Sequence, residues 1–196
     1  MRLLVLASSS SRSVARAKRR TVCRIEVVIE PFRDQIKLLI TIPGVSRLTA
    51  DVIIAETGGD MSVFPTAGHL ASWAGTTPGH NESAGRVKSA RTRPGNPHLK
   101  PALGIAAMAA SRANGTYLQA FFKRIAARRG YLKGMVATGH TMLVAVWHML
   151  TNNTVYADLG GTYFAGLDPQ KAVRQALRRL EQLGYSATLT PINTAA

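Results

Sequence analysis

The sequence predicts an all-α protein that is mostly helical, with a helix-hairpin-helix-like element and a long basic loop. Apolar residues recur at three- and four-residue spacing through most of the chain, which is the pattern of amphipathic helices. No two segments of alternating polarity joined by a turn signal are evident, so no strand pair is predicted. At 196 residues the chain is long enough to bury the core of one domain.

The first half of the chain is predicted to hold three helices and a loop. Residues 25–41 carry apolar side chains at helical spacing, and a Pro-Gly pair ends this segment. Ser46 is the predicted N-cap of a second helix over residues 46–57. A short third helix is predicted over residues 67–74. The polar segment 75–94 has few apolar side chains, so it is predicted to be a loop. Long loops on compact domains tend to carry function.

The second half of the chain is predicted to be helical apart from one connection. Asn96 is the predicted N-cap of a helix whose first position is a proline, a favoured arrangement. Residues 116–129 are amphipathic, and the more apolar residues 134–150 predict a central buried helix. After an irregular connection over residues 152–166, residues 169–183 predict a final helix that carries several basic side chains.

Three regions are expected along the chain. Residues 1–24 are predicted to be a disordered basic arm, because their apolar run is too short for a signal peptide. Residues 25–190 are predicted to form one helical module, and residues 191–196 a tail. The expected parts of the module are a helix-hairpin-helix-like element at 32–57, a serine-bearing basic loop at 75–95 and a helical core at 96–183.

The charge distribution predicts a polyanionic partner. The formal net charge is +15, and between residues 61 and 157 the single acidic residue Glu82 stands against eleven Lys and Arg residues. An excess of this size in a folded region favours nucleic acid, above all DNA, as the partner. The alternative is a solvated basic surface that serves solubility.

Other residue types limit the classes of site and the location. Cys23 is the single cysteine, which excludes a disulfide framework and a cysteine-based metal site. It favours a reducing, cytoplasmic setting. The apolar segment 135–150 is short and carries two histidines, so no membrane partner is expected. His140 and His148 are expected in the core, and no histidine is given a catalytic role.

The turn between the first two predicted helices is a candidate DNA contact. Its residues Gly44, Val45 and Ser46 resemble a helix-hairpin-helix turn, in which backbone N–H groups and a helix N-terminus face a phosphate. Such a contact does not depend on base sequence. The alternative is an ordinary turn between helices.

The basic loop contains the candidate catalytic residue. Ser83 and Ser89 lie among cations, which would stabilise the charge that develops when a serine attacks a phosphodiester. A loop that only holds backbone phosphates would have the same composition. The candidate nucleic-acid-binding residues here are Arg86, Lys88, Arg91, Arg93, Asn96 and Lys100.

An ordered series of short motifs extends this interpretation. The motifs are Ile42-Pro43-Gly44, Ala74-Gly75, Pro78, Ser83-Ala84-Gly85, Pro94-Gly95-Asn96, Leu99-Lys100, Arg129-Gly130, Trp147-His148-Met149-Leu150 and Tyr156 to Phe164. Together they resemble the C-terminal, serine-containing module of bacterial insertion-sequence transposases of the IS one-ten and IS one-sixteen type. The resemblance spans about residues 36–185. Ala84 stands where the family often has glycine, and Lys100 where arginine is usual.

The resemblance implies DNA transposition and recombination. In this family a serine, here Ser83, attacks a DNA phosphodiester to form a covalent intermediate, and a structured guide RNA selects the target. The family also has an N-terminal RuvC-like domain whose carboxylates bind a divalent metal such as magnesium. Residues 1–24 do not resemble that domain, so no cofactor is expected in this chain.

Two kinds of function follow from these expectations. The chain is either the serine-bearing part of a DNA recombinase, in a homo-oligomer or with an intact transposase as partner, or a non-catalytic helical fragment that binds DNA or RNA. A decayed transposase remnant is a variant of the second alternative.

Overall fold

The computed structural model describes residues 30–79, 81–84, 86–89 and 91–189. The predicted arm (1–24) and tail (191–196) lie outside the described residues. The elements in chain order are η1 (Glu30–Phe32), α2 (Arg33–Ile40), α3 (Arg47–Thr57), η2 (Met61–Val63), α4 (Ala67–Trp73), β1 (Asn81–Ser83), β2 (Arg86–Ser89), α5 (Leu99–Ala110), α6 (Tyr117–Arg129), α7 (Tyr131–Asn152), α8 (Tyr163–Leu167) and α9 (Pro169–Gln182). The prediction of a mostly helical protein is confirmed.

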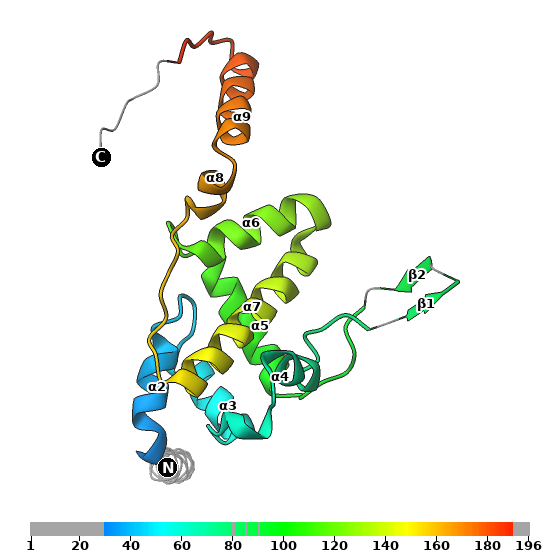
Figure 1. The fold of residues 1–196 in the computed structure, drawn as a ribbon, viewed down its shortest axis with the longest axis vertical. Helices are drawn as coiled ribbons and strands as arrows, with labels where there is room; N and C mark the ends of the chain where they lie inside the picture. Colours follow the sequence, from blue (N-terminus) through cyan, green and yellow to red (C-terminus); the bar gives the residue numbers. More distant parts are fainter. Residues whose placement is uncertain (1–29, 80, 85, 90, 190–196) are drawn as a thin grey trace, which may run out of the picture.

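The long helix α7 is the centre of the fold (Figure 1). It packs against α2, α4, α5 and α6. Its side chains at Thr138, Met142, Leu143 and Val146 are fully buried. A helix that is apolar around most of its circumference has to be enclosed in this way, as the sequence pattern of residues 134–150 predicts. The neighbouring helices bring Ile36, Leu39, Ile53, Leu70, Leu99 and Leu103 to the same core.

Short polar side chains fix where several helices begin. Ser46 Oγ accepts a hydrogen bond from the Thr49 amide (3.2 Å), so the predicted N-cap of α3 is confirmed. Thr116 Oγ1 caps α6 through the Gln119 amide (3.3 Å), and Asp168 Oδ1 caps α9 through the Lys171 amide (3.0 Å). Each cap satisfies an N–H group that the first turn of a helix leaves without an intrahelical partner.

The C-terminal elements extend from α6 (Figure 1). Tyr117 of α6 contacts Phe164 of α8, with ring centroids 5.3 Å apart, and the guanidinium of Arg124 lies 4.8 Å from the Phe164 ring centroid. Beyond this aromatic contact, α9 has no buried residue. Its exposed apolar side chains include Val173 and Leu180.

Five features differ from the sequence predictions. The segment 75–94, predicted as a loop, carries the two-stranded β-hairpin β1–β2. The helix predicted to follow Asn96 begins at Leu99, and α7 begins three residues before the predicted Gly134. The one-turn helix α8 lies within the connection predicted to be irregular. The first predicted helix, where described, is the 3-10 turn η1 followed by α2.

Among the described residues, no helix is both long enough and apolar enough to cross a membrane.

Candidate nucleic-acid interface

Residues 76–94 form a hairpin extension that projects from the helical body (Figure 1). Strands β1 and β2 pair antiparallel, and Ser83 lies opposite Arg86 in the register. The side chains of Ser83 and Arg86 are exposed. Residues that face each other across antiparallel strands have Cβ atoms about 5 Å apart, which places a cation beside the serine.

The residue after β1 has an unfavourable backbone conformation. Ala84 has a φ of 52°, in the left-handed region that side chains with a Cβ rarely adopt. Tight two-residue hairpin turns need such positive φ values, which is why Asn-Gly and Gly-Gly sequences favour them. An alanine there costs about 1 kcal/mol relative to glycine.

Replacing Ala84 with glycine is therefore expected to stabilise the hairpin by about 1 kcal/mol. Hydrogen exchange of the amides in β1 and β2 should slow. The matched control is Ala109→Gly, since Ala109 is an exposed alanine inside α5. That change should destabilise the helix by about 1 kcal/mol. Loss of protection in the hairpin of the Ala84→Gly variant would contradict the strain argument.

At the base of the hairpin extension the backbones of Gly75 and Gly95 pack directly against each other, and we call this contact the glycine clamp. The backbones of Gly75 and Gly95 touch so closely that a Cβ on Gly95 would lie 2.3 Å from the carbonyl oxygen of Ala74. A Cβ on Gly75 would lie 2.7 Å from the Gly95 Cα. Since both distances are far below van der Waals contact, glycine is required on both sides. The clamp fixes where the extension leaves the helical body and where it returns.

Hydrogen bonds hold the segment just beyond the clamp. The Gly79 amide donates to the Arg91 carbonyl oxygen (2.9 Å). The Lys100 ammonium donates to Thr92 Oγ1 (2.9 Å) and to the Arg93 carbonyl oxygen (3.0 Å). An ammonium group has three N–H donors, so Lys100 retains one for a ligand.

Asn96 joins the end of the extension to two helices. Its Oδ1 accepts from the amides of His98 (2.9 Å) and Leu99 (2.8 Å). The prediction that Asn96 is the N-cap of α5 is wrong, because the helix begins at Leu99 and its N-cap is His98. Its Nδ2 donates to Glu56 Oε2 of α3 at 2.6 Å. Asn96 is a predicted nucleic-acid-binding residue, and in the structure its side-chain amide is engaged within the protein.

Two adjoining cavities flank the base of the extension. One, of about 780 Å³, is lined by Gly79, Ser89, Arg91, Thr92, Arg93, Pro94 and Lys100. The other, of about 650 Å³, lies between the extension and α7. Of the predicted nucleic-acid-binding residues, the structure thus brings Arg91, Arg93 and Lys100 together. Arg86 lies at the hairpin turn, and the side chain of Lys88 lies outside the described part of the structure.

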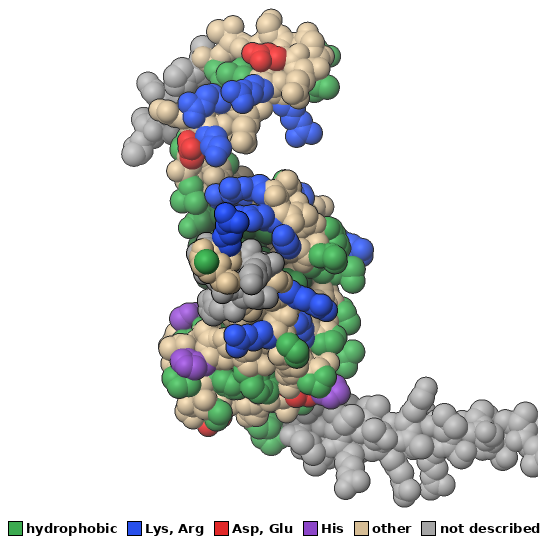
Figure 2. Space-filling model, turned by 90° about the vertical axis from the view of Figure 1, so that its right-hand side faces the viewer, with side chains coloured by type: hydrophobic (Ala, Val, Ile, Leu, Met, Phe, Trp, Pro, Cys, Tyr) green, Lys and Arg blue, Asp and Glu red, His purple; other side chains and the backbone are tan. Residues whose placement is uncertain are grey.

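The surface around the extension is basic. Figure 2 shows Lys and Arg side chains gathered around the extension, whereas the Asp and Glu side chains on this face lie toward its two ends. A positively charged surface attracts a polyanion over a distance of about one Debye length, roughly 8 Å at physiological ionic strength.

The turn between α2 and α3 lies elsewhere in the fold. A Cβ on Gly44 would lie 2.5 Å from the Ala106 carbonyl oxygen, so this turn packs against the C-terminal half of α5. Ala106 is six residues along α5 from Lys100, or about 9 Å of helix. The predicted contacts of Gly44, Val45 and Ser46 with DNA therefore form a second group, separate from the extension.

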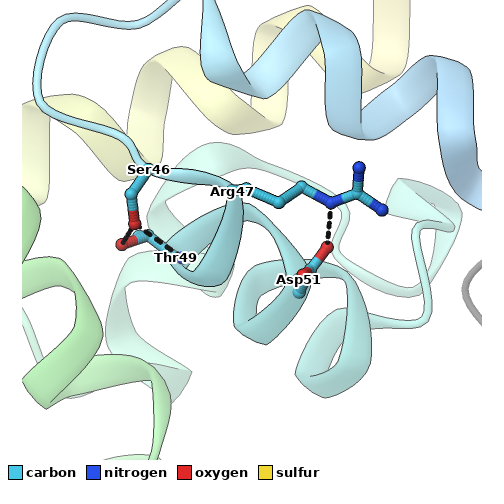
Figure 3. A network of polar contacts seen from close by, with 4 residues as sticks. All are labelled: Ser46, Arg47, Thr49 and Asp51. Carbon is cyan, nitrogen blue, oxygen red and sulfur yellow. Dashed lines mark hydrogen bonds and ion pairs between the residues drawn. The ribbon is translucent and has the colours of Figure 1, made fainter. Parts of the chain in front are cut away.

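Several polar groups of this second turn already have partners within the protein (Figure 3). The Val45 amide donates to the Ile42 carbonyl oxygen (3.0 Å), and Ser46 Oγ caps α3. Arg47 Nε donates to Asp51 Oδ1 (2.8 Å). This arrangement stabilises the start of α3, and a DNA contact by the turn stays a prediction.

Comparison with known proteins covers both the hairpin extension and the α2–α3 turn. Residues 36–123 match the model of the Transposase IS116/IS110/IS902 family. Over these residues the chain is similar to that transposase family. The resemblance predicted from the motifs is thus confirmed.

Two curated relatives are similar to more of the chain. The Insertion element IS110 uncharacterized 43.6 kDa protein of Streptomyces coelicolor is 28% identical over 150 residues, which is 76% of this chain and 36% of the relative. The Insertion element IS900 uncharacterized 42 kDa protein of Mycobacterium paratuberculosis is 25% identical over 122 residues, 61% of this chain and 30% of the relative. The match spans about a third of the length of these relatives.

The matched segment, residues 36–123, includes the α2–α3 turn, the hairpin extension and its glycine clamp. The second cavity is also lined by residues that follow this segment. Leu132, Lys133, Val136, Ala137 and His140 of α7 line that cavity. The sequence pattern predicted His140 in the core. It is half-buried and opens onto the cavity, whereas His148, also expected in the core, is exposed. The spacing of apolar residues in α7 does not show that His140 is half-buried while His148 is exposed.

The described residues offer no metal centre. Within the parts of the chain that the structure covers, no three His, Cys, Asp or Glu side chains come together. These residues therefore do not fit the divalent metal that the family resemblance connects with a carboxylate domain.

Proposed function

We propose that this chain is the serine-bearing module of an insertion-sequence transposase, which binds DNA and becomes covalently joined to it through Ser83. The observation that carries the proposal is the exposed Ser83 at the turn of a projecting hairpin, opposite the exposed Arg86. The match of residues 36–123 to the transposase family model supports a role in transposition.

The proposed chemistry is a phosphodiester exchange. Ser83 Oγ forms a bond to the phosphorus, the bond from phosphorus to the sugar oxygen breaks, and the serine proton passes to water while the leaving oxygen takes up a proton. Attack by another sugar hydroxyl reverses the step and joins new strands. Because negative charge gathers on the phosphoryl oxygens, the neighbouring Arg86 guanidinium would stabilise the transition state.

The cations at the base of the extension have a different proposed role. Arg91, Arg93 and Lys100 line one cavity and are tied to a clamped backbone, so they would hold a DNA phosphate at a fixed distance from the hairpin turn. Replacing one of these cations with a neutral residue should make the negative slope of log K against log salt concentration shallower by about 0.9.

The test is a denaturing gel that detects protein covalently joined to labelled, branched DNA, with the carboxylate domain of an intact relative supplied in trans. Ser83→Ala is expected to abolish the adduct while leaving DNA binding intact. The matched control is Ser72→Ala, which removes an exposed hydroxyl from α4 and should leave the adduct unchanged. An adduct that persists in Ser83→Ala would refute the assignment of the nucleophile.

A second candidate is a non-catalytic module that binds DNA or a structured RNA. The cavity lined by Arg91, Arg93 and Lys100 favours this second function independently, because Ser83 does not line that cavity. This function predicts salt-dependent binding that is the same with and without Ser83, and no adduct under any condition. The guide RNA, the assembly with further copies or with an intact transposase, and a cytoplasmic site of action at the bacterial chromosome are parts of the first proposal.

A further inference from the structure

The two cavities beside the extension are neighbours and differ in chemistry, so we treat them as two halves of one candidate site. They share Ser89, Arg91 and Thr92. The first half holds the cations Arg91, Arg93 and Lys100. The second half has an apolar wall on α7, where Leu132 is 78% exposed and Val136 38% exposed. An apolar wall next to a cationic pocket matches a ligand with one flat apolar part and one anionic part.

A polar group completes the apolar half. His140 Nδ1 lies 3.4 Å from Thr76 Oγ1, and this hydroxyl donates its proton to the Ala71 carbonyl oxygen (3.1 Å). The Nδ1–H group of His140 therefore donates to the Thr76 hydroxyl oxygen, and the Nε2 atom is left as a hydrogen-bond acceptor. Burial lowers the pKa of His140, so the ring is neutral at pH 7 and this pattern holds.

We infer that this candidate site binds one unpaired nucleotide of a DNA strand, with its base against Leu132 and Val136 and its phosphate on Arg91, Arg93 and Lys100. The inference rests on the proposed DNA-binding function and adds the form of DNA that this site selects. A base inside a duplex has both faces stacked, so only an unpaired base can offer a face to an apolar wall. Each half, at about 780 and 650 Å³, lies within the roughly 300–1,000 Å³ of small-molecule sites, so each half has room for one part of a nucleotide.

The charges around the site favour a nucleotide over an apolar peptide. Between residues 61 and 157 the sequence has one acidic residue against eleven basic ones, and four of those basic residues, Arg91, Arg93, Lys100 and Lys133, line the two cavities. A phosphate would be held by charge-assisted hydrogen bonds. An apolar peptide would leave these cations without a counter-charge.

The experiment compares three DNA probes by fluorescence anisotropy at one salt concentration. The probes are a perfect duplex, the same duplex with a single bulged nucleotide, and the bulged duplex with an abasic residue at the bulge. The intact chain is expected to bind the base-containing bulge about ten-fold more tightly than the abasic one, within the range of measured base-stacking effects. A ribose version of the bulged strand is included, and tighter binding to it would overturn the assignment to DNA.

The decisive variant is Leu132→Ser, which removes the apolar wall at a highly exposed position and should not affect folding. It is expected to lose the preference for the base while it binds the perfect duplex as before. The matched control is Leu48→Ser, because Leu48 of α3 is 73% exposed and lies outside both cavities. This control should retain the ten-fold preference.

The outcomes separate this inference from the proposed function. Salt-dependent duplex binding without a preference for the base, or a preference that persists in Leu132→Ser, would overturn the nucleotide site alone. Failure to bind any probe would overturn the proposed function as well.

Discussion

The variant Gly95→Ala is expected to destabilise the protein by about 3 kcal/mol or more. The added Cβ would lie 2.3 Å from the Ala74 carbonyl oxygen and 2.4 Å from the Gly75 nitrogen. Both are backbone atoms that cannot rotate away, so either the start of α5 or the end of α4 has to shift. Chemical denaturation followed by circular dichroism measures the loss, and the affinity for duplex DNA should fall because the extension no longer leaves the body at the same place.

A matched glycine shows whether the clamp is responsible. Gly104 lies within α5, and a Cβ there would have nothing within 4 Å. Gly104→Ala is therefore expected to stabilise the protein by about 0.5–1 kcal/mol, because alanine is the better helix former. If Gly95→Ala were as stable as the wild type, the close approach of Gly75 and Gly95 would not be a feature of the folded protein.

The variant Asn96→Asp is expected to cost about 3 kcal/mol at pH 7. The change keeps the oxygen that accepts from the Leu99 amide, but it replaces the side-chain amide that donates to Glu56 Oε2 at 2.6 Å with a second carboxylate. A hydrogen bond to a charged group is lost and two like charges face each other in a partly buried site. Like-charge repulsion raises the pKa of the introduced carboxyl in the folded state above its unfolded value.

This raised pKa predicts how the cost of Asn96→Asp depends on pH. The deficit is full at pH 7 and shrinks as the pH falls toward about 4, because the folded state then binds a proton that the unfolded state holds less tightly. Urea denaturation at a series of pH values measures it. Adding Glu56→Gln supplies an amide donor from the other side and should recover most of the loss. A double variant no more stable than Asn96→Asp would show that the pair does not interact.

The helices that were predicted well are those whose ends depend on nearby residues. The N-cap Ser46 bonds to the amide of Thr49, three residues away, so the local sequence carries the signal for the start of α3. The hairpin β1–β2 was missed because its turn begins with Ala84, not with an asparagine or glycine that would mark a tight turn. The start of α7 was placed late because Gly130 and Gly134 resemble helix ends in sequence.

The candidate site was predicted only where its residues are close in sequence. Ser83 and its neighbouring cations form one local motif. The contacts that build the base of the extension are long-range: Asn96 bonds to Glu56 across 40 positions, and His140 contacts Thr76 across 64. Apolar spacing in one helix shows that it packs, but it does not show which side chain borders a cavity formed with a distant segment.

The glycine clamp has a consequence for how far Ser83 stands from the protein. Since Gly75 and Gly95 already touch, the helices on either side keep their positions whatever number of residues lies between them. Doubling the length of a flexible loop costs only about 0.6 kcal/mol. Adding two residues to each strand would move the serine outward by about 6.6 Å and keep it on the same face of the hairpin. The reach of the reactive hydroxyl can therefore be adjusted to the width of a DNA substrate without altering the core.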